Sequence, residues 1–239
     1  MAHTTESSAA WPPGYHINPR THSLPAALVE AFRAIPVAVA GDCMGRSIGA
    51  TGLHGYHGSL DTVLCGPAIT VRVRPGDNLM IHAAIALAQP GDILVIDGKG
   101  DQTAALMGTL MLSACKKRGL GGVIVDGCIR DKLELLGLDF PVFSAGFNPA
   151  GPTKFVPGRV NHPIACGGAM VHPGDLVVGD ADGVVVIERA KAPAMLALAV
   201  KKVADEAARI ESIARGDTAA KWLPAALRAA GVLKEGETL

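Results

Sequence analysis

Two short apolar runs constrain the fold of this chain more than any other feature: Ile93–Asp97 (ILVID) and Gly122–Asp126 (GVIVD). Each run is short and almost wholly apolar, which is typical of a strand buried on both faces of a sheet. Between them, Thr103–Arg118 has the pattern of a helix, with basic residues near its end and Gly119 as a stop. This strand–helix–strand order with short connections predicts parallel strands joined by right-handed crossovers.

The alternation of strands and helices continues on both sides of this unit. Before it, we expect a helix at Leu24–Ala34, a Gly-rich loop at Ser47–Ser59, a strand at Cys65–Val73 and a helix at Asn78–Ala88 that Asp77 caps. After it, we expect a helix at Asp131–Leu136, strands at Pro141–Ser144, Val160–Ala165, Ala169–Val171, Leu176–Val178 and Val184–Glu188, hairpin turns at 172–175 and 180–183, and a long helix at Ala194–Ala214. The sequence therefore predicts a mixed α/β sandwich, with parallel and antiparallel parts in a single domain.

The two ends of the chain differ in composition from this middle part. Residues 1–22 are largely polar and contain several prolines, and we expect them to form an N-terminal arm. Residues 23–216 carry the alternating elements and form the predicted domain. Residues 217–239 form a C-terminal tail with one short amphipathic stretch, Leu223–Ala229. We expect this tail to be helical and, because the C-terminal segment is rich in Ala and Leu, to lie at a subunit interface.

Charge and composition argue against several classes of function. Lys and Arg total 22, as do Asp and Glu, so no basic excess exists for binding a phosphate backbone. Aromatic residues make up 4% of the chain, which argues against base-stacking surfaces. The five cysteines lack CxxC spacing and are expected to be reduced. The chain also contains no run of about 18 apolar residues, the length that a membrane-spanning helix needs. We therefore expect a cytoplasmic protein with no nucleic-acid or membrane partner.

The dipeptide Arg130-Asp131, which follows the second apolar run, is the strongest candidate for chemistry. In parallel α/β proteins, ligands bind beyond the carboxyl ends of strands and near helix N-termini. Arg130 can bind a carboxylate through two parallel hydrogen bonds. Asp131, whose side chain we expect to point elsewhere, suits Mg²⁺, which often binds through one or two carboxylates. Spacing alone favours a plainer arrangement, in which Arg130 pairs with a surface acid and Asp131 caps the next helix.

A wider set of motifs resembles one protein family. The matching segments are Gly108–Met111, Arg118–Asp131, Gly66–Ala68, Pro75–Asn78, Pro157–Asn161, Cys166–Gly168, Pro173–Asp175 and Asp180–Val184. Together they resemble the family that joins the class II 4-hydroxy-4-methyl-2-oxoglutarate/4-carboxy-4-hydroxy-2-oxoadipate aldolases with the RraA-like proteins (regulator of ribonuclease activity A). The resemblance covers roughly residues 25 to 216, and it implies the swivelling β/α/β fold of RraA-like proteins. Each segment alone is a weak signal, but the set is a strong one.

The resemblance implies a metal-dependent lyase. Aldolase members cleave 4-hydroxy-2-oxo acids into pyruvate and a second carbonyl compound, using a divalent metal that is commonly Mg²⁺ or Mn²⁺. The family's Arg–Asp pair matches Arg130, which would bind the pyruvyl part and stabilise the enolate, and Asp131, which would ligate the metal within a shell made mainly of water. Oxaloacetate decarboxylation passes through the same enolate and is an expected further activity.

The segment Gly108, Thr109, Leu110 and Met111 matches the family segment whose backbone N–H groups bind the substrate carboxylate. This conflicts with a helix that begins near Thr103, because only the first turn of a helix has free N–H groups. Thr109 also departs from the aldolase pattern, which usually has an acid there to support the metal's outer shell. Ribonuclease-regulating members typically lack the aspartate of the pair. Asp131 therefore favours the lyase over the alternative, a non-catalytic RraA-like regulator that binds a protein partner.

Three further residues are weaker candidates: Asp97, Lys154 and Glu206. Asp97 could reach the site from the end of its strand, or hold the Gly-rich loop that follows. Lys154 could contact a distal carboxylate, or be solvated. Glu206 could enter a neighbouring subunit's site, because the resemblance also implies a homotrimer or a hexamer of two trimers; a helical pair with Lys202 is the plainer interpretation. A third function named in the family is methylation of menaquinone precursors. The sequence does not support it, because it shows no Gly-rich loop for binding S-adenosylmethionine.

Overall fold

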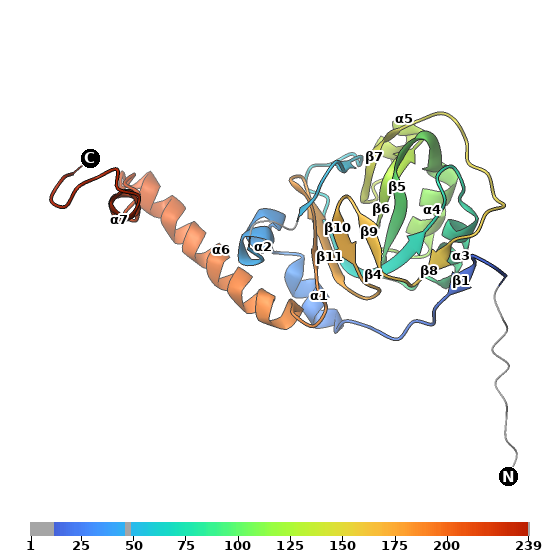
Figure 1. Ribbon diagram of the computed structural model, residues 1–239, viewed down its shortest axis with the longest axis horizontal. Coiled ribbons are helices and arrows are strands. Elements are labelled where there is room, and N and C mark those ends of the chain that lie inside the picture. The colour runs from blue at the N-terminus through green and yellow to red at the C-terminus, as the bar shows by residue number, and fades with distance from the viewer. Residues whose placement is uncertain (1–11, 46–48, 239) are drawn as a thin grey trace, which may run out of the picture. The chain divides into compact units, whose positions relative to one another are not determined.

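The computed structural model describes residues 12–45 and 49–238, and it divides into two compact units, Met1–Ala199 and Val200–Leu239. The helices of the first unit are α1 (Ala26–Phe32), α2 (Val37–Cys43), α3 (Leu79–Leu87), α4 (Thr109–Lys117), α5 (Lys132–Leu136) and the beginning of α6 (Ala192–Ala214). Its strands are β1 (His16–Ile17), β2 (Gly49–Ala50), β3 (His54–Gly55), β4 (Leu64–Arg72), β5 (Ile93–Met107), β6 (Gly122–Ile129), β7 (Val142–Phe147), β8 (Arg159–Val160), β9 (Ile164–Cys166), β10 (Ala169–Val171), β11 (Leu176–Asp180) and β12 (Gly183–Ile187). Figure 1 shows these elements.

The centre of the first unit is a mixed sheet with the strand order β2-β12-β11-β4-β5-β6-β7-β3. Strands β4, β5, β6 and β7 are parallel neighbours, as the alternating sequence predicts. The antiparallel pairs β11–β4 and β11–β12 extend the sheet on one side, and β8 pairs with both β4 and β1. The predicted mixed α/β fold with parallel and antiparallel parts is confirmed.

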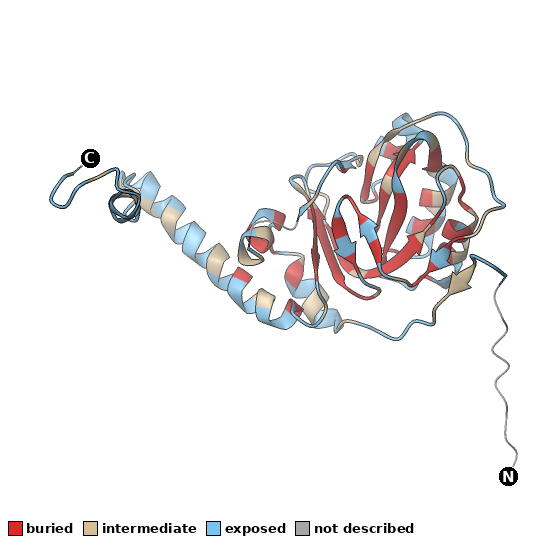
Figure 2. Cartoon of the chain, in the orientation of Figure 1, coloured by how far each residue is buried: buried red, intermediate tan, exposed pale blue. Residues whose placement is uncertain are grey.

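Side chains on β5 alternate between two hydrophobic layers, one on each face of the sheet. Leu94 and Ile96 belong to the layer that α3 and α4 complete, whereas Ile93 and Val95 belong to the layer that the β9–β10 hairpin covers. All four side chains are at most 1% exposed, so the interpretation of this run as a strand buried on both faces is correct. Figure 2 shows the same burial along the central strands. This packing fixes where the carboxyl ends of β5 and β6 lie.

The predicted helix at Thr103–Arg118 is wrong in its first third. Strand β5 continues through three register shifts to Met107, pairing Ala105 with Cys128 and Met107 with Ile129, and α4 begins only at Thr109. The N–H of Ala105 also donates to the carbonyl of Ala150, so these backbone groups have partners outside a helix. The conflict over Gly108–Met111 is thereby resolved, because this segment is the N-cap and first turn of α4.

The other differences concern short elements. The turn at 172–175 does not close a hairpin, because β10 pairs with β9 and β11 pairs with β12; the turn at 180–183 closes one as predicted. The expected strand Val160–Ala165 is divided between β8 and β9, and the Gly-rich loop contains the two-residue strands β2 and β3. Helix α2 has no counterpart among the predicted elements.

The second unit consists of the rest of α6 and of α7 (Leu223–Ala229), both of which match predicted helices. Between them, the Arg209 guanidinium donates to the carbonyls of Asp217 and Ala219 at 3.0 and 2.9 Å, which fixes the turn after Gly216. No described residue of this unit is buried. The boundaries predicted at residues 22 and 216 and the interface role of the tail stay predictions.

Burial determines the chemistry of the cysteine thiols. All five cysteines are free, and every one except Cys43 is buried. Burial raises the pKa of the Cys65 thiol to about 11 and that of Cys115 to about 12, so neither is a thiolate nucleophile at neutral pH. Within residues 12–45 and 49–238, none of the helices is long and apolar enough to span a bilayer.

Candidate active site

Strand β6 delivers Arg130 and Asp131 to the carboxyl edge of the parallel sheet. The N–H of Arg130 donates to the carbonyl of Met107 at 3.0 Å, so the end of β6 is tied to the end of β5. Asp131 then adopts a left-handed backbone conformation, with φ at 67°, before α5 begins. The expectation that the two side chains point apart is wrong: Arg130 Nε lies 3.8 Å from Asp131 Oδ1. Both remain partly exposed, at 43% and 37%, and are accessible to a ligand.

The first turn of α4 holds the Asp131 carboxylate. The N–H of Thr109 donates to Asp131 Oδ2 at 2.8 Å, and Gly108 precedes it as the N-cap in an extended conformation. A Cβ atom on Gly108 would lie 2.5 Å from Asp131 Oδ2 and 3.0 Å from Arg130 Cγ. A Cβ on Gly151 would lie 2.9 Å from Arg130 Nη1. Two glycines therefore give the functional pair its space, and the helix N-terminus adds a favourable field for negative charge.

One pocket brings most of the predicted site residues together. It has a volume of about 190 Å³ and is lined by Asn78, His82, Leu106, Met107, Gly108, Leu110, Met111, Arg130, Asp131, Pro152 and Lys154. Lys154 lines this pocket, which is the position that contact with a distal substrate carboxylate requires. Thr109 contributes its N–H to Asp131, while its hydroxyl oxygen is buried and has no partner among the described residues.

Sequence reasoning missed Asn78, His82 and Pro152 as lining residues. Asn78 is buried, and its side-chain N–H donates to the carbonyl of Leu106 at 3.0 Å. Burial and the charge of Lys154 lower the pKa of His82, so this imidazole is neutral at pH 7. One signal in the sequence could have identified two of them. Asn78 and His82 are four residues apart at the start of α3, the helix that follows β4, so they share a face.

Two candidates lie elsewhere. Asp97 accepts a hydrogen bond from Arg72 Nε at 2.7 Å and another from the N–H of Lys99 at 3.2 Å, so it holds its own loop and does not line the pocket. Glu206 belongs to the second unit and pairs with Lys202 at 3.0 Å, one helical turn away. The plainer interpretations of both residues agree with these contacts.

The pocket offers a divalent cation one protein carboxylate. Asp131 is the acidic side chain among its lining residues, and the described part of the chain has no cluster of three or more His, Cys, Asp or Glu side chains suited to a metal. This donor set does not suit Zn²⁺, which takes three or four protein ligands. It does suit Mg²⁺, which keeps several waters and binds through one or two carboxylates. Asp131 Oδ1, the oxygen that Thr109 does not contact, would be the ligand atom.

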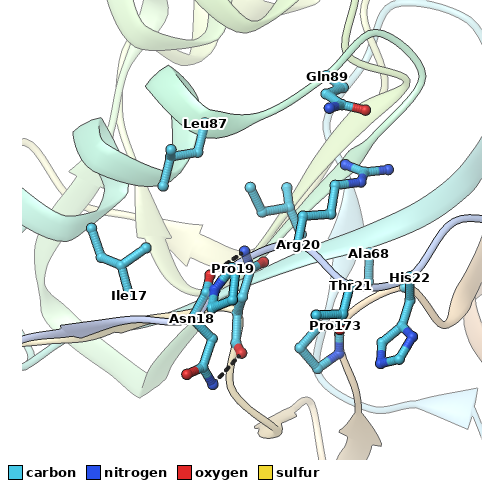
Figure 3. Close-up of a pocket in the computed structure, with 13 residues that line it drawn as sticks. Ile17, Asn18, Pro19, Arg20, Thr21, His22, Ala68, Leu87, Gln89 and Pro173 are labelled. Atoms are coloured by element: carbon cyan, nitrogen blue, oxygen red, sulfur yellow. Dashed lines mark hydrogen bonds between the residues drawn. The ribbon is translucent and has the colours of Figure 1, made fainter. Parts of the chain in front are cut away.

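A larger pocket of about 440 Å³ lies at the other end of the parallel strands. Figure 3 shows segment 17–22 of the N-terminal arm beside β4, with Leu87 and Gln89 across from it. Three of its polar side chains already have protein partners: Arg20 Nη1 donates to Asp92 Oδ2 at 2.5 Å, and Asn18 and Asn161 donate to each other's carbonyls at 3.0 and 3.1 Å. Ligands of parallel α/β proteins bind at the carboxyl edge, so we assign the candidate active site to the pocket of Arg130 and Asp131.

Comparisons with known proteins define the class of this chain. The family model described as RraA-like, Aldolase/RraA, matches residues 28–186. The chain therefore belongs to the RraA-like family of aldolases and RraA proteins. A protein of Halalkalibacterium halodurans, provisionally named 4-hydroxy-4-methyl-2-oxoglutarate aldolase, is 42% identical over 185 residues, which cover 77% of this chain and 88% of the relative.

Two solved structures extend the comparison. RraAS2 of Streptomyces coelicolor, described as an unusual member of the RNase ES inhibitor RraA family, is similar with a TM-score of 0.71 and 27% identity, over 79% of this chain and 99% of that one. A Geobacillus kaustophilus protein named S-adenosylmethionine: 2-dimethylmenaquinone methyltransferase has a TM-score of 0.60 and 33% identity, over 64% of this chain and 95% of that one. The family and its relatives thus support an aldolase or RraA-like function.

Proposed function

We propose that this chain is a divalent-metal-dependent lyase that cleaves a 4-hydroxy-2-oxo dicarboxylic or tricarboxylic acid, such as 4-hydroxy-4-methyl-2-oxoglutarate, into pyruvate and a second carbonyl compound. The observation that carries the proposal is the juxtaposition of Arg130 and Asp131, 3.8 Å apart, in one pocket beside the first turn of α4. The name of the Halalkalibacterium halodurans relative supports the same substrate class.

Different residues of the pocket bind different parts of the substrate. The Arg130 guanidinium binds the pyruvyl carboxylate and stabilises the negative charge that develops on the enolate. The first turn of α4 adds the backbone N–H of Leu110 to this anionic end, because the N–H groups of Thr109 and Met111 donate to Asp131 Oδ2 and to the carbonyl of Gly108. Lys154, which also lines the pocket, binds the second carboxylate, while neutral His82 is available for hydrogen bonding. A divalent cation on Asp131, Mg²⁺ or Mn²⁺, would supply Lewis acidity toward the 2-keto oxygen.

Cleavage proceeds as a retro-aldol reaction. A water molecule in the pocket accepts the proton of the 4-hydroxyl group, the C4–O bond becomes a carbonyl, and the C3–C4 electron pair passes to the pyruvyl fragment. Arg130 holds the resulting enolate until C3 is protonated and pyruvate leaves. Loss of carbon dioxide from oxaloacetate gives the same enolate, so oxaloacetate decarboxylation is part of the proposal.

The experiment is to measure pyruvate release from 4-hydroxy-4-methyl-2-oxoglutarate and from oxaloacetate, with Mg²⁺ or Mn²⁺ and with a chelator. We expect metal-dependent turnover that Arg130→Ala and Asp131→Ala each reduce by a factor of about 100 to 1,000. Lys117→Ala and Asp61→Ala, which remove exposed charges outside the pocket, are matched controls. Wild-type protein without turnover on either substrate would contradict the proposal.

The second candidate is a non-catalytic RraA-like regulator that binds a protein partner. The observation in its favour is the similarity to RraAS2 over 99% of that protein. It predicts no metal-dependent turnover and no effect of Asp131→Ala on any measured activity. Under either function we propose a homotrimer or a hexamer of two trimers, which sedimentation would measure directly.

A further inference from the structure

The loop at residues 152–158 brings Lys154 to the pocket, yet it has little hydrophobic anchoring of its own. From Pro152 to Pro157 no side chain is buried, and Phe155 is 81% exposed. The prolines at both ends restrict φ only at their own positions. Burial of apolar surface therefore cannot fix residues 153–156, and polar contacts must do so.

Asp77 supplies three of those contacts, and Thr153 also exchanges hydrogen bonds with the backbone of Gly76 and Asn78. Its Oδ2 atom accepts hydrogen bonds from the Thr153 hydroxyl at 2.7 Å and from the N–H groups of Phe155 and Val156 at 2.8 and 3.3 Å. Its Oδ1 atom accepts the N–H of Leu79 at 3.0 Å, at the start of α3. Burial alone would raise the pKa of this carboxyl, but the four hydrogen bonds outweigh it and lower the pKa. The ionised carboxylate is thus the form that the loop requires.

The N-terminal arm holds the same loop from a second direction. The Tyr15 hydroxyl donates to the carbonyl of Phe155 at 2.9 Å, and the N–H of His16 donates to the carbonyl of Gly158 at 3.2 Å. Strand β1 then pairs in parallel with β8, which follows the loop directly. The arm precedes residues 28–186, the part of the chain that matches the family. The residues of the arm that hold the loop therefore lie outside the part of the chain that the family model matches.

We propose that Asp77 and Tyr15 are positioning residues, which together fix loop 152–158 and hold the Lys154 ammonium at the pocket of Arg130 and Asp131. The function of Lys154 as the group that binds the second carboxylate rests on the proposed function. The fixation of the loop does not, and it can be tested without turnover.

The first experiment measures amide hydrogen exchange at residues 153–156. In Asp77→Asn one carboxylate oxygen becomes an N–H donor, so the variant loses either the three loop contacts or the Leu79 contact. We expect exchange of the Phe155 and Val156 amides to become at least about tenfold faster in this variant. Tyr15→Phe, which removes one neutral hydrogen bond, should give a smaller increase.

Asp175→Asn is the matched control for this experiment. Asp175 is equally buried, at 3% against 2% for Asp77, and its carboxylate likewise accepts backbone N–H groups, those of His172 and Arg189. It does not line the Arg130 pocket. We expect this control to leave exchange at residues 153–156 unchanged. Unchanged exchange in folded Asp77→Asn and Asp77→Ala variants, the second of which removes both oxygens, would overturn the proposal. Equal acceleration in Asp77→Asn and Asp175→Asn would overturn it as well.

The second experiment is a double-mutant cycle on turnover of a 2-oxo dicarboxylate. Asp77→Asn should raise KM about tenfold with little change in kcat, because it weakens a contact made equally in the ground and transition states. Lys154→Met should do the same, and the double variant should be no worse than Lys154→Met alone. Additive effects would show that Asp77 does not act through Lys154. If the wild-type protein has no turnover, the proposed function fails, and the exchange experiment still decides whether the loop is fixed as inferred.

Discussion

At each of the two pockets, at opposite ends of the parallel strands, an arginine of the lining is paired with an aspartate, and the two pairs differ in geometry. Arg20 Nη1 lies 2.5 Å from Asp92 Oδ2, and the Asp92 side chain is 1% exposed. Arg130 Nε lies 3.8 Å from Asp131 Oδ1, and both side chains are more than a third exposed. The first pair uses its charges on each other. The second leaves the Arg130 guanidinium and Asp131 Oδ1 available to a ligand, so distance and exposure, more than residue type, separate a structural pair from a site.

The largest effect should come from removing the space that keeps the second pair in place. Gly108→Ala places a Cβ 2.5 Å from Asp131 Oδ2, which is held by the N–H of Thr109 and cannot move without losing that bond. A displacement of about 1 Å at a reacting group can cost about a hundredfold in rate. We expect Gly108→Ala to reduce pyruvate release by about that factor, measured by steady-state kinetics with Mg²⁺.

Gly41→Ala is the matched control. Gly41 lies within α2, where the nearest atom to an added Cβ is Val185 Cγ1 at 4.0 Å. Replacing glycine by alanine in a helix favours folding by up to about 1 kcal/mol. This variant should be at least as stable as the wild type and equally active. A Gly108→Ala variant with wild-type kinetics would show that the pair tolerates displacement.

The first pair should affect stability and leave activity unchanged. Arg20→Ala removes the cation beside Asp92 and leaves a fully buried carboxylate with the N–H of Gln89 as its remaining hydrogen-bond donor. We expect the free energy of unfolding to fall by about 2 kcal/mol, measured by denaturant titration, with kcat/KM unchanged. Arg130→Ala should show the reverse, and a large loss of activity in Arg20→Ala would mean that the comparison assigns the pairs wrongly.

Much of this architecture could be predicted from the sequence, because the central strands are specified by local patterns. Ile93–Asp97 and Gly122–Asp126 are strands as predicted, and α3, α6 and α7 lie within two residues of their predicted bounds. The family resemblance named Arg130, Asp131 and Gly108 as site residues, and Lys154 was a separate, weaker candidate; all four line one pocket. Their predicted chemical roles still depend on the experiments.

The parts that could not be predicted depend on contacts distant in sequence. Residues 98–107 have no strong preference of their own, and their strand conformation comes from pairing with β6 and from the Ala105 contact with Ala150. Asp131 points back toward Arg130 because its backbone is left-handed, a conformation that a non-glycine residue seldom adopts. Asn78 and His82 become lining residues only because α3 packs beside the end of β4.

A smaller effect should follow from changing the charge at the position where Thr109 departs from the aldolase pattern. Without metal, Thr109→Asp places a second carboxylate beside Asp131 and should lower the melting temperature through like-charge repulsion. With Mg²⁺ the same variant should be stabilised more than the wild type, with a metal affinity about tenfold higher. Thermal unfolding across a Mg²⁺ titration measures both, with Thr109→Asn as the uncharged control. A variant that Mg²⁺ stabilises no more than the control would argue against a cation on Asp131.

The smallest predicted effect concerns the proton on His82. Burial, and after it the charge of Lys154, lower its pKa from 6.5, so below that pH the unfolded chain binds more protons than the folded one. His82 therefore makes stability fall as the pH drops from 6.5 toward the folded pKa. Lys154→Met removes the second cause, so the pKa should rise while staying below 6.5, and the loss of stability in acid should shrink. A histidine NMR titration measures the shift, with exposed Lys117→Met as the control; an unchanged His82 pKa would mean that the Lys154 ammonium does not face this pocket.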